Sequence, residues 1–254
     1  MEYYILQFVL LMIIFARIVT LFSVAPIYSN TVIPIQVRIS IALFFSFVLF
    51  SLLKDTAPKI NLDILSFSLL VVIETIVGLT IGFMMTLIFW GMQYAGELMG
   101  FDLGLNIATL YDPETGNNPV LGRFFNYVAL LIFLLINGHH FVINAIKISY
   151  DSIPIGGFTL SADFIEKVSK LTSIIFILSI KIAAPILVSL FLTNISLGIM
   201  SRVVPQMNIF LVGAPLKIGV GIVIISIIMP FIITVFRKLL YTFESNVIEI
   251  IRVM

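Results

Sequence analysis

The stretch from Ser201 to Gly221, SRVVPQMNIFLVGAPLKIGVG, is polar and broken, although apolar segments flank it on both sides. It contains the polar residues Arg202, Gln206, Asn208 and Lys217. Pro205 and Pro215 prevent one continuous helix through the stretch. Irregular backbone at membrane depth is tolerated only where protein buries it or where it lines a watery cavity. The stretch is therefore either a surface loop or a segment held inside a cavity or an assembly.

The composition indicates a membrane protein. Of the 254 residues, 61% are hydrophobic and only 11% are charged, whereas a soluble domain carries about 25% charged residues. The mean hydropathy is +1.20. The net charge of +1, without a basic run, gives no sign of nucleic-acid binding. The chain has no cysteine, which excludes disulfides and thiolate metal sites.

Six apolar segments are long enough to be membrane helices, because about 20 residues cross roughly 30 Å of hydrocarbon. They are Tyr4–Val24, Val37–Leu53, Leu62–Trp90, Phe124–Ile146, Leu171–Leu192 and Ile218–Phe236. An amphipathic tail, Arg237–Met254, follows them, and Ser161 in SADFIEK is the expected N-cap before the fifth segment. The first segment lacks a basic leading region and a cleavage site, so we expect a retained helix of an inner-membrane protein. The sequence therefore predicts an all-α membrane protein.

A second polar interruption, Gly91–Arg123, separates the third and fourth segments. Gly96, Gly100 and Gly104 recur every four residues, so on a helix they form one smooth ridge for close backbone packing. The Asp-Pro and Gly-Asn pairs that follow predict a loop with an unusually apolar first half. This loop contains Asn106, Leu110, Tyr111, Asp112, Pro113, Gly116 and Asn117. An ordinary exposed connector and a buried functional loop both remain open.

Three ionisable residues lie inside apolar segments: Arg17, Glu74 and Lys181. Charged groups at that depth are functional candidates, because hydrocarbon solvates them poorly. Arg17 and Glu74 most simply satisfy each other as an internal pair, and we expect Lys181 to face the interior rather than lipid. A proton pathway through Glu74 finds less support, because no further acidic residue follows it at helical spacing.

The sequence has no catalytic or metal-binding motif. It lacks a GxSxG elbow and a glycine-rich phosphate loop ending in Lys-Ser or Lys-Thr. Its two histidines, His139 and His140, are adjacent, and neighbouring residues on a helix point about 100° apart. We therefore expect a polar helix end at this NGHH sequence, no metal, no cofactor and no enzymatic activity.

Four blocks of the chain together resemble a known family. They are Phe15–Leu43, Glu74–Asn126, Phe133–Gly156 with its Gly-His-His, and Arg202–Gly221 with its Pro-Gln-Met-Asn-x-Phe. In this order they resemble the FliR family of flagellar biosynthesis proteins, part of the type III export gate. Injectisome export proteins are similar in outline, and the last block favours the flagellar branch.

The resemblance implies an assembly with FliP, FliQ and FlhB homologues in the inner membrane, at the flagellar basal body. The apolar segments would be bent helical hairpins packed against sister subunits rather than simple lipid spans. Residues 1–165 would be FliP-like and residues 166–254 FliQ-like. The loop at about residues 106–119 would plug the channel for exported flagellar proteins. A subunit junction or pore-proximal region would contain Arg202, Pro205, Gln206, Asn208 and Lys217.

A polytopic small-solute secondary transporter is the main alternative. Broken helices with charged residues at mid-depth also suit that class. It predicts inverted repeats, which the sequence does not show. An intramembrane enzyme would need a nucleophile or a metal set that the chain lacks.

Overall fold

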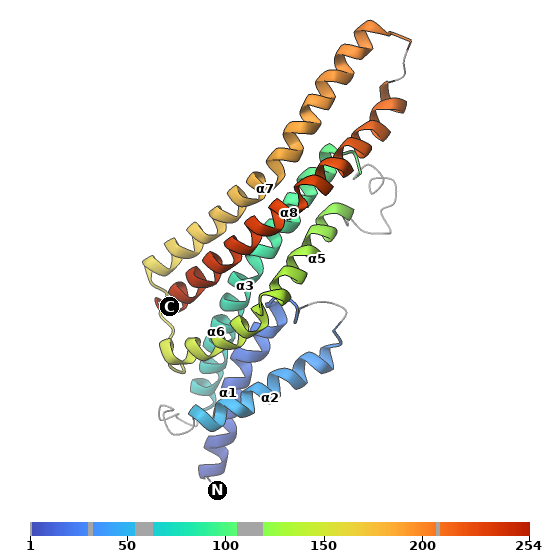
Figure 1. The fold of residues 1–254 in the computed structure, drawn as a ribbon. Helices are drawn as coiled ribbons and strands as arrows, with labels where there is room; N and C mark the ends of the chain where they lie inside the picture. Colours follow the sequence, from blue (N-terminus) through green and yellow to red (C-terminus); the bar gives the residue numbers. More distant parts are fainter. Residues whose placement is uncertain (1, 30–32, 54–62, 106–118, 207–208) are drawn as a thin grey trace. The chain divides into compact units, whose positions relative to one another are not determined.

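The computed structural model describes residues 2–29, 33–53, 63–105, 119–206 and 209–254, and this part of the chain forms seven helices (Figure 1). They are α1 (Glu2–Val24), α2 (Ile35–Leu53), α3 (Ile64–Asp102), α5 (Val120–Leu135), α6 (Gly138–Ser152), α7 (Ala162–Val203) and α8 (Ile209–Ile251). Five of these helices are long and apolar enough to cross a membrane, and α5 with α6 forms a bent sixth candidate. The expected all-helical membrane fold is confirmed.

The helices form two compact units. One contains Met1–Leu87, Asn137–Leu171 and Thr242–Met254, and the other contains Ile88–Ile136 and Thr172–Tyr241. Each unit has its own apolar core, with Ile14, Ile18 and Phe22 fully buried in the first and Met92, Phe125 and Phe236 buried in the second. The expected boundary at residue 165 separates a FliP-like part from a FliQ-like part, and these two units do not test it. It stays a prediction.

The fourth expected segment, Phe124–Ile146, is not one helix. It breaks at Asn137, which lies between α5 and α6 and adopts the left-handed conformation (φ 61°, ψ 33°). Asparagine tolerates this conformation better than most residues. Both sides of the break are apolar, so hydropathy joined them into one segment, whereas the expected polar helix end at the NGHH sequence is confirmed.

The third expected segment is longer than predicted, because α3 continues through the polar sequence to Asp102. Gly96 and Gly100 lie on this helix and are buried. Gly104 lies beyond the helix end with φ 78°, and the Leu105 amide donates to the Gly100 carbonyl at 3.1 Å. A left-handed glycine is a common helix terminator. Gly104 therefore ends the helix, and its expected place on the packing ridge was wrong.

The last two segments are also longer than predicted. The α7 helix begins after Ser161, whose Oγ accepts a hydrogen bond from the Phe164 amide at 3.1 Å, so the expected N-cap is confirmed. The α8 helix contains Pro215 and Pro230, and the expected separate tail is its C-terminal part. Within the polar stretch Ser201–Gly221, α7 thus ends at Val203, just before Pro205, while Pro215 is accommodated within α8.

Two glycines on α3 allow it to approach α1 closely. A Cβ atom at Gly78 would overlap the Arg17 carbonyl oxygen and Thr20 Oγ1, and one at Gly82 would lie 2.9 Å from the Leu21 carbonyl oxygen. Thr86 Oγ1 donates to the Val24 carbonyl oxygen at 2.8 Å, one turn further along α3. The α1–α3 interface is therefore a backbone-to-backbone contact along several turns.

Replacing Gly78→Ala should lower the stability of the protein by about 1–3 kcal/mol, because the added methyl group has rigid backbone as its neighbour. Unfolding in a detergent titration would measure this. Gly198→Ala in α7 is the matched control, since nothing lies within 4 Å of its added Cβ atom. Equal effects of the two substitutions would contradict the close α1–α3 contact.

Candidate functional site

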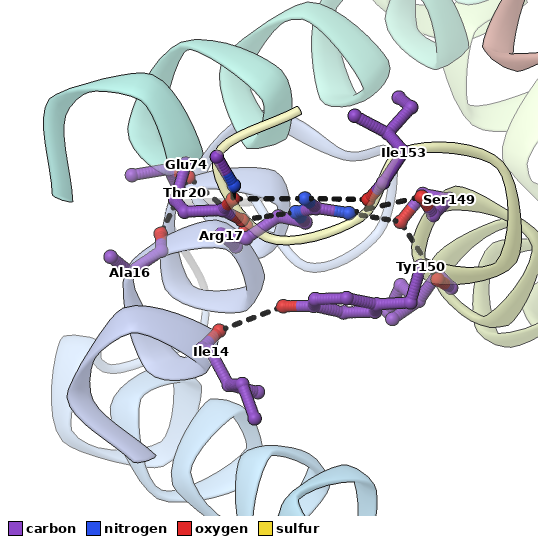
Figure 2. Close-up of polar contacts among 10 residues, drawn as sticks. Ile14, Ala16, Arg17, Thr20, Glu74, Ser149, Tyr150 and Ile153 are labelled. Atoms are coloured by element: carbon purple, nitrogen blue, oxygen red, sulfur yellow. Dashed lines mark hydrogen bonds and ion pairs between the residues drawn. The ribbon is translucent and has the colours of Figure 1, made fainter. Parts of the chain in front are cut away.

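The most highly connected polar site in the described part of the chain surrounds Arg17 on α1. Its side chain meets Glu74 on α3 and Ser149 on α6 (Figure 2). All three residues are 0% exposed. The backbone of Ile153, the residue that caps α6, completes the contacts. Side chains or backbone from three helices and a turn thus converge on one guanidinium group, which we name the Arg17 node.

Every N–H group of the guanidinium finds an acceptor. Nε donates to Glu74 Oε2, and Nη2 donates to Glu74 Oε1 at 3.0 Å and to the Ile153 carbonyl oxygen at 3.1 Å. Nη1 donates to the carbonyl oxygen and Oγ of Ser149 at 3.1 and 3.3 Å. A buried ion pair is tolerated only when its remaining hydrogen-bonding groups are also satisfied. The Arg17 node meets this condition.

A tyrosine and a glycine complete the node. Arg17 Cζ lies 4.0 Å from the centre of the Tyr150 ring, a cation–π geometry, and Tyr150 Oη donates to the Ile14 carbonyl oxygen at 3.2 Å. The Gly156 amide donates to Glu74 Oε1 at 3.0 Å, and Gly156 has φ +75°. A side chain there would be strained and would also meet Leu70. The turn after α6 is therefore fixed to the carboxylate.

The chemistry of the node is that of a structural connector. Arg17 and Glu74 are paired, as their sequence positions suggested, but both side chains are buried. The guanidinium has no donor left for a ligand. Three residues of the node, Ser149, Tyr150 and Gly156, were not predicted, because nothing in their local pattern shows that α6 returns to α1 and α3.

A second polar cluster lies where α3 meets α5. Gln93 Nε2 donates to Glu97 Oε1 at 2.9 Å, Asn126 Nδ2 donates to Gln93 Oε1 at 3.3 Å, and all three side chains are half-buried. A Cβ atom at Gly96 would lie 2.6 Å from the Leu121 carbonyl oxygen. Gly96 therefore packs closely against another helix, as the ridge predicted. The i, i+4 spacing of Gln93 and Glu97 was the available sequence signal for this cluster.

The proposed junction residues lie around the end of the α7–α8 hairpin. Arg202, Pro205 and Gln206 are exposed and Lys217 is half-buried, while Asn208 lies outside the described residues. Lys181, in the middle of α7, is exposed. The buried face of α7 is formed by residues such as Ile182 and Ile186, so Lys181 does not lie in the core of this chain, and its expected place away from lipid stays a prediction.

The expected plug residues, Asn106 to Asn117, lie outside the described residues. The described chain resumes at Pro119, which precedes the first residue of α5. At the NGHH sequence the His139 and His140 rings lie 4.3 Å apart at the start of α6. Among the described residues, no group of three or more His, Cys, Asp or Glu is placed to hold a metal ion.

These features define a polytopic, all-helical membrane protein with an internal ion pair. The family described as bacterial export proteins, family 1, matches residues 8–243. The flagellar biosynthetic protein FliR of Escherichia coli (strain K12) is 34% identical over 219 residues, which cover 85% of this chain and 82% of that protein. FliR of Bacillus subtilis (strain 168) is 34% identical over 231 residues, 89% of this chain and 88% of that protein.

The chain therefore belongs to the FliR family of bacterial export proteins. The surface presentation of antigens protein SpaR of Shigella flexneri is a more distant relative, 28% identical over 218 residues that cover 84% of this chain and 82% of that protein. The resemblance inferred from the four sequence blocks is confirmed. Members of this family are non-enzymatic export proteins, and so is this chain.

Arg17→Met should destabilise the protein by about 3–5 kcal/mol, because it leaves the Glu74 carboxylate buried without its partner. Glu74→Met should cost a similar amount, whereas the double substitution should cost less than the sum of the two. Detergent unfolding of the four proteins would measure the coupling. Arg123→Gln, at an exposed arginine, is the control and should have little effect. Simple additivity of the two node substitutions would contradict the pair.

Proposed function

We propose that this chain is a subunit of the flagellar type III export gate. In this role it helps to form and close the channel through which unfolded flagellar proteins are exported. The observation that carries the proposal is the family match over residues 8–243, joined to relatives named flagellar biosynthetic proteins that align over most of both chains. FliP, FliQ and FlhB homologues would be its partners, in the inner membrane at the flagellar basal body.

The exposed apolar surface of the chain supports a role within lipid or a larger assembly. In the apolar stretches of α2 and α8 that could span a membrane, only 11% of the residues are buried by the chain itself. Phe44 and Phe47 of α2 are 64% and 66% exposed. A water-soluble protein rarely leaves such surfaces uncovered.

The loop at about residues 106–119 is the proposed channel plug. Leu110 and Tyr111 would supply apolar bulk, and Asp112-Pro113 with Gly116 would set its bend. The described helices on either side support this role, because α3 and α5 pack closely where Gly96 meets Leu121 and Gly122. A loop whose two ends are anchored by close-packed helices can move without separating those helices.

The proposed junction at the hairpin end would place Arg202, Pro205, Gln206, Asn208 and Lys217 near sister subunits. The exposure of Arg202, Pro205 and Gln206 supports this, because polar groups at the end of an apolar hairpin need water or a polar partner. Secretion assays with Gln206→Ala would test the junction once assembly has been shown.

Replacing residues 106–118 by a glycine–serine linker of equal length should leave the assembly intact and make membranes permeable to ions and small solutes. Conductance of purified complexes in planar bilayers would measure the leak, and mass measurement of the same sample would verify assembly. A linker of the same composition in place of residues 55–61, in the loop between α2 and α3, is the control. An assembled complex that shows no added conductance would contradict the plug assignment.

Co-expression with FliP and FliQ homologues should yield one large species that contains this chain. Native mass spectrometry of the detergent-purified complex would show its composition. A monodisperse chain that binds neither partner would contradict the gate role and favour the transporter. The Arg17 node already weakens that alternative, because Arg17 and Glu74 are saturated by protein groups instead of facing a cavity.

A further inference from the structure

The α7 helix carries one continuous stripe of exposed residues, which we name the α7 seam. Its members follow one another at alternating intervals of four and three residues: Ile177, Lys181, Ala184, Val188, Phe191 and Ile195. This spacing is that of the contact positions of a coiled coil, so the residues share one side of the helix. Its four large apolar side chains are between 44% and 60% exposed, Lys181 is exposed and Ala184 is half-buried.

The opposite side of α7 makes the contacts with the rest of the chain. Ser179 Oγ donates a hydrogen bond to the Gly91 carbonyl oxygen of α3 at 2.8 Å, and a Cβ atom at Gly91 would lie 2.7 Å from Ile175 Cγ2. The residues that are at most 7% exposed on this side are Ile175, Ile182, Ile186, Leu190 and Leu197. The seam is therefore not needed for the packing of α7 within the described part of the chain.

Lys181 is the only charged residue of a long helical stretch. Residues 171–201 contain no other charge, and residues 167–243 contain neither Asp nor Glu. Among the residues that the structure describes, the ion pairs join Arg17 to Glu74 and Lys167 to two carboxylates, and Lys181 forms none. The ammonium group at the seam thus has no counter-charge from the chain as described.

The surroundings of Lys181 argue against a lipid headgroup as its partner. The uncharged residues 171–180 that precede it extend about 15 Å along the helix, and they include Phe176 and Ile180, which are 55% and 56% exposed. Val188 and Phe191 are exposed on the other side of Lys181. Headgroups at Lys181 would leave one of these apolar surfaces in water. Hydrocarbon at Lys181 would leave its charge poorly solvated.

We infer that the α7 seam binds an apolar helix of a sister subunit that carries an aspartate or glutamate opposite Lys181. Such a helix covers the apolar side chains on both sides of Lys181, and its carboxylate neutralises the ammonium group. One polar residue in a coiled-coil seam also fixes the register of the two helices, at a cost in stability. The inference deepens the proposed export role and rests on it, because it states the chemistry by which this chain holds a sister subunit.

A carbodiimide that enters apolar regions provides a direct test, because it joins an amine to a carboxylate only where the two are in contact. In the purified complex with FliP and FliQ homologues, it should join Lys181 to an acidic residue of another subunit, as detected by mass spectrometry of the crosslinked peptides. Lys181→Arg keeps the charge without the reactive amine, so this variant should assemble and lose the crosslink. Lys147→Arg, at an exposed lysine of α6, should keep it.

Lys181→Met should lower the yield of the complex about tenfold or more, because it leaves the carboxylate of the sister subunit buried without its counter-charge. Lys147→Met is the matched control and should give the yield of the unchanged chain. Native mass spectrometry of complexes purified from equal amounts of membrane would measure both.

Three results would overturn the inference. They are an assembled complex without the Lys181 crosslink, as expected if lipid covers the seam, a crosslink from Lys181 to a carboxylate of the same chain, and a Lys181→Met complex that forms as readily as the unchanged one. If no complex forms with FliP and FliQ homologues at all, the proposed function fails. The two failures are therefore distinguishable.

Discussion

A guanidinium group without access to water holds α1, α3 and α6 together. Burying a charge is costly unless it is paired and fully hydrogen-bonded, so the acceptors around Arg17 must all be present at once. They come from α3 and from α6 with the turn that follows it. These two parts of the chain are far apart in the sequence and far from Arg17. Loss of one acceptor would leave charge or donors unsatisfied, which makes the arrangement of these elements cooperative.

The need to pair every donor of the buried Arg17 explains why particular residue types occupy the positions around the node. Lysine could not replace Arg17, because its ammonium group has fewer donors and lacks the planar geometry that serves Glu74, Ser149 and Ile153 together. Gly78 lies one turn beyond Glu74 and meets the carbonyl oxygen of Arg17 itself. The side chain and the backbone of one arginine thus both contact α3, and the second contact is possible only without a Cβ atom.

Sequence alone predicted the parts of the fold that depend on local composition. The apolar segments, the Ser161 cap and the mutual need of Arg17 and Glu74 can all be read from residue types and spacing. The polar NGHH sequence also indicated a helix end, which α5 and α6 confirm. The left-handed conformation of Asn137 was not predicted, because the apolar residues on both sides read as one segment. The apolar segment predicted to end at Trp90 is extended to Asp102, because the polar residues that follow it continue the helix and one of them, Gln93, pairs with Asn126 of α5.

Charged residues of the apolar helices are of two kinds: Arg17 is buried and paired, whereas Lys181 is exposed. Arg17 is neutralised within the protein, and its helix can therefore be buried along that face. Lys181 has an exposed side chain on a helix whose hairpin contains no carboxylate between Glu166 and Glu244. A cation of this kind needs water or a polar partner, because an apolar environment solvates it poorly. Lys181 must therefore find that partner outside the described part of this chain's core, whereas Arg17 finds it inside.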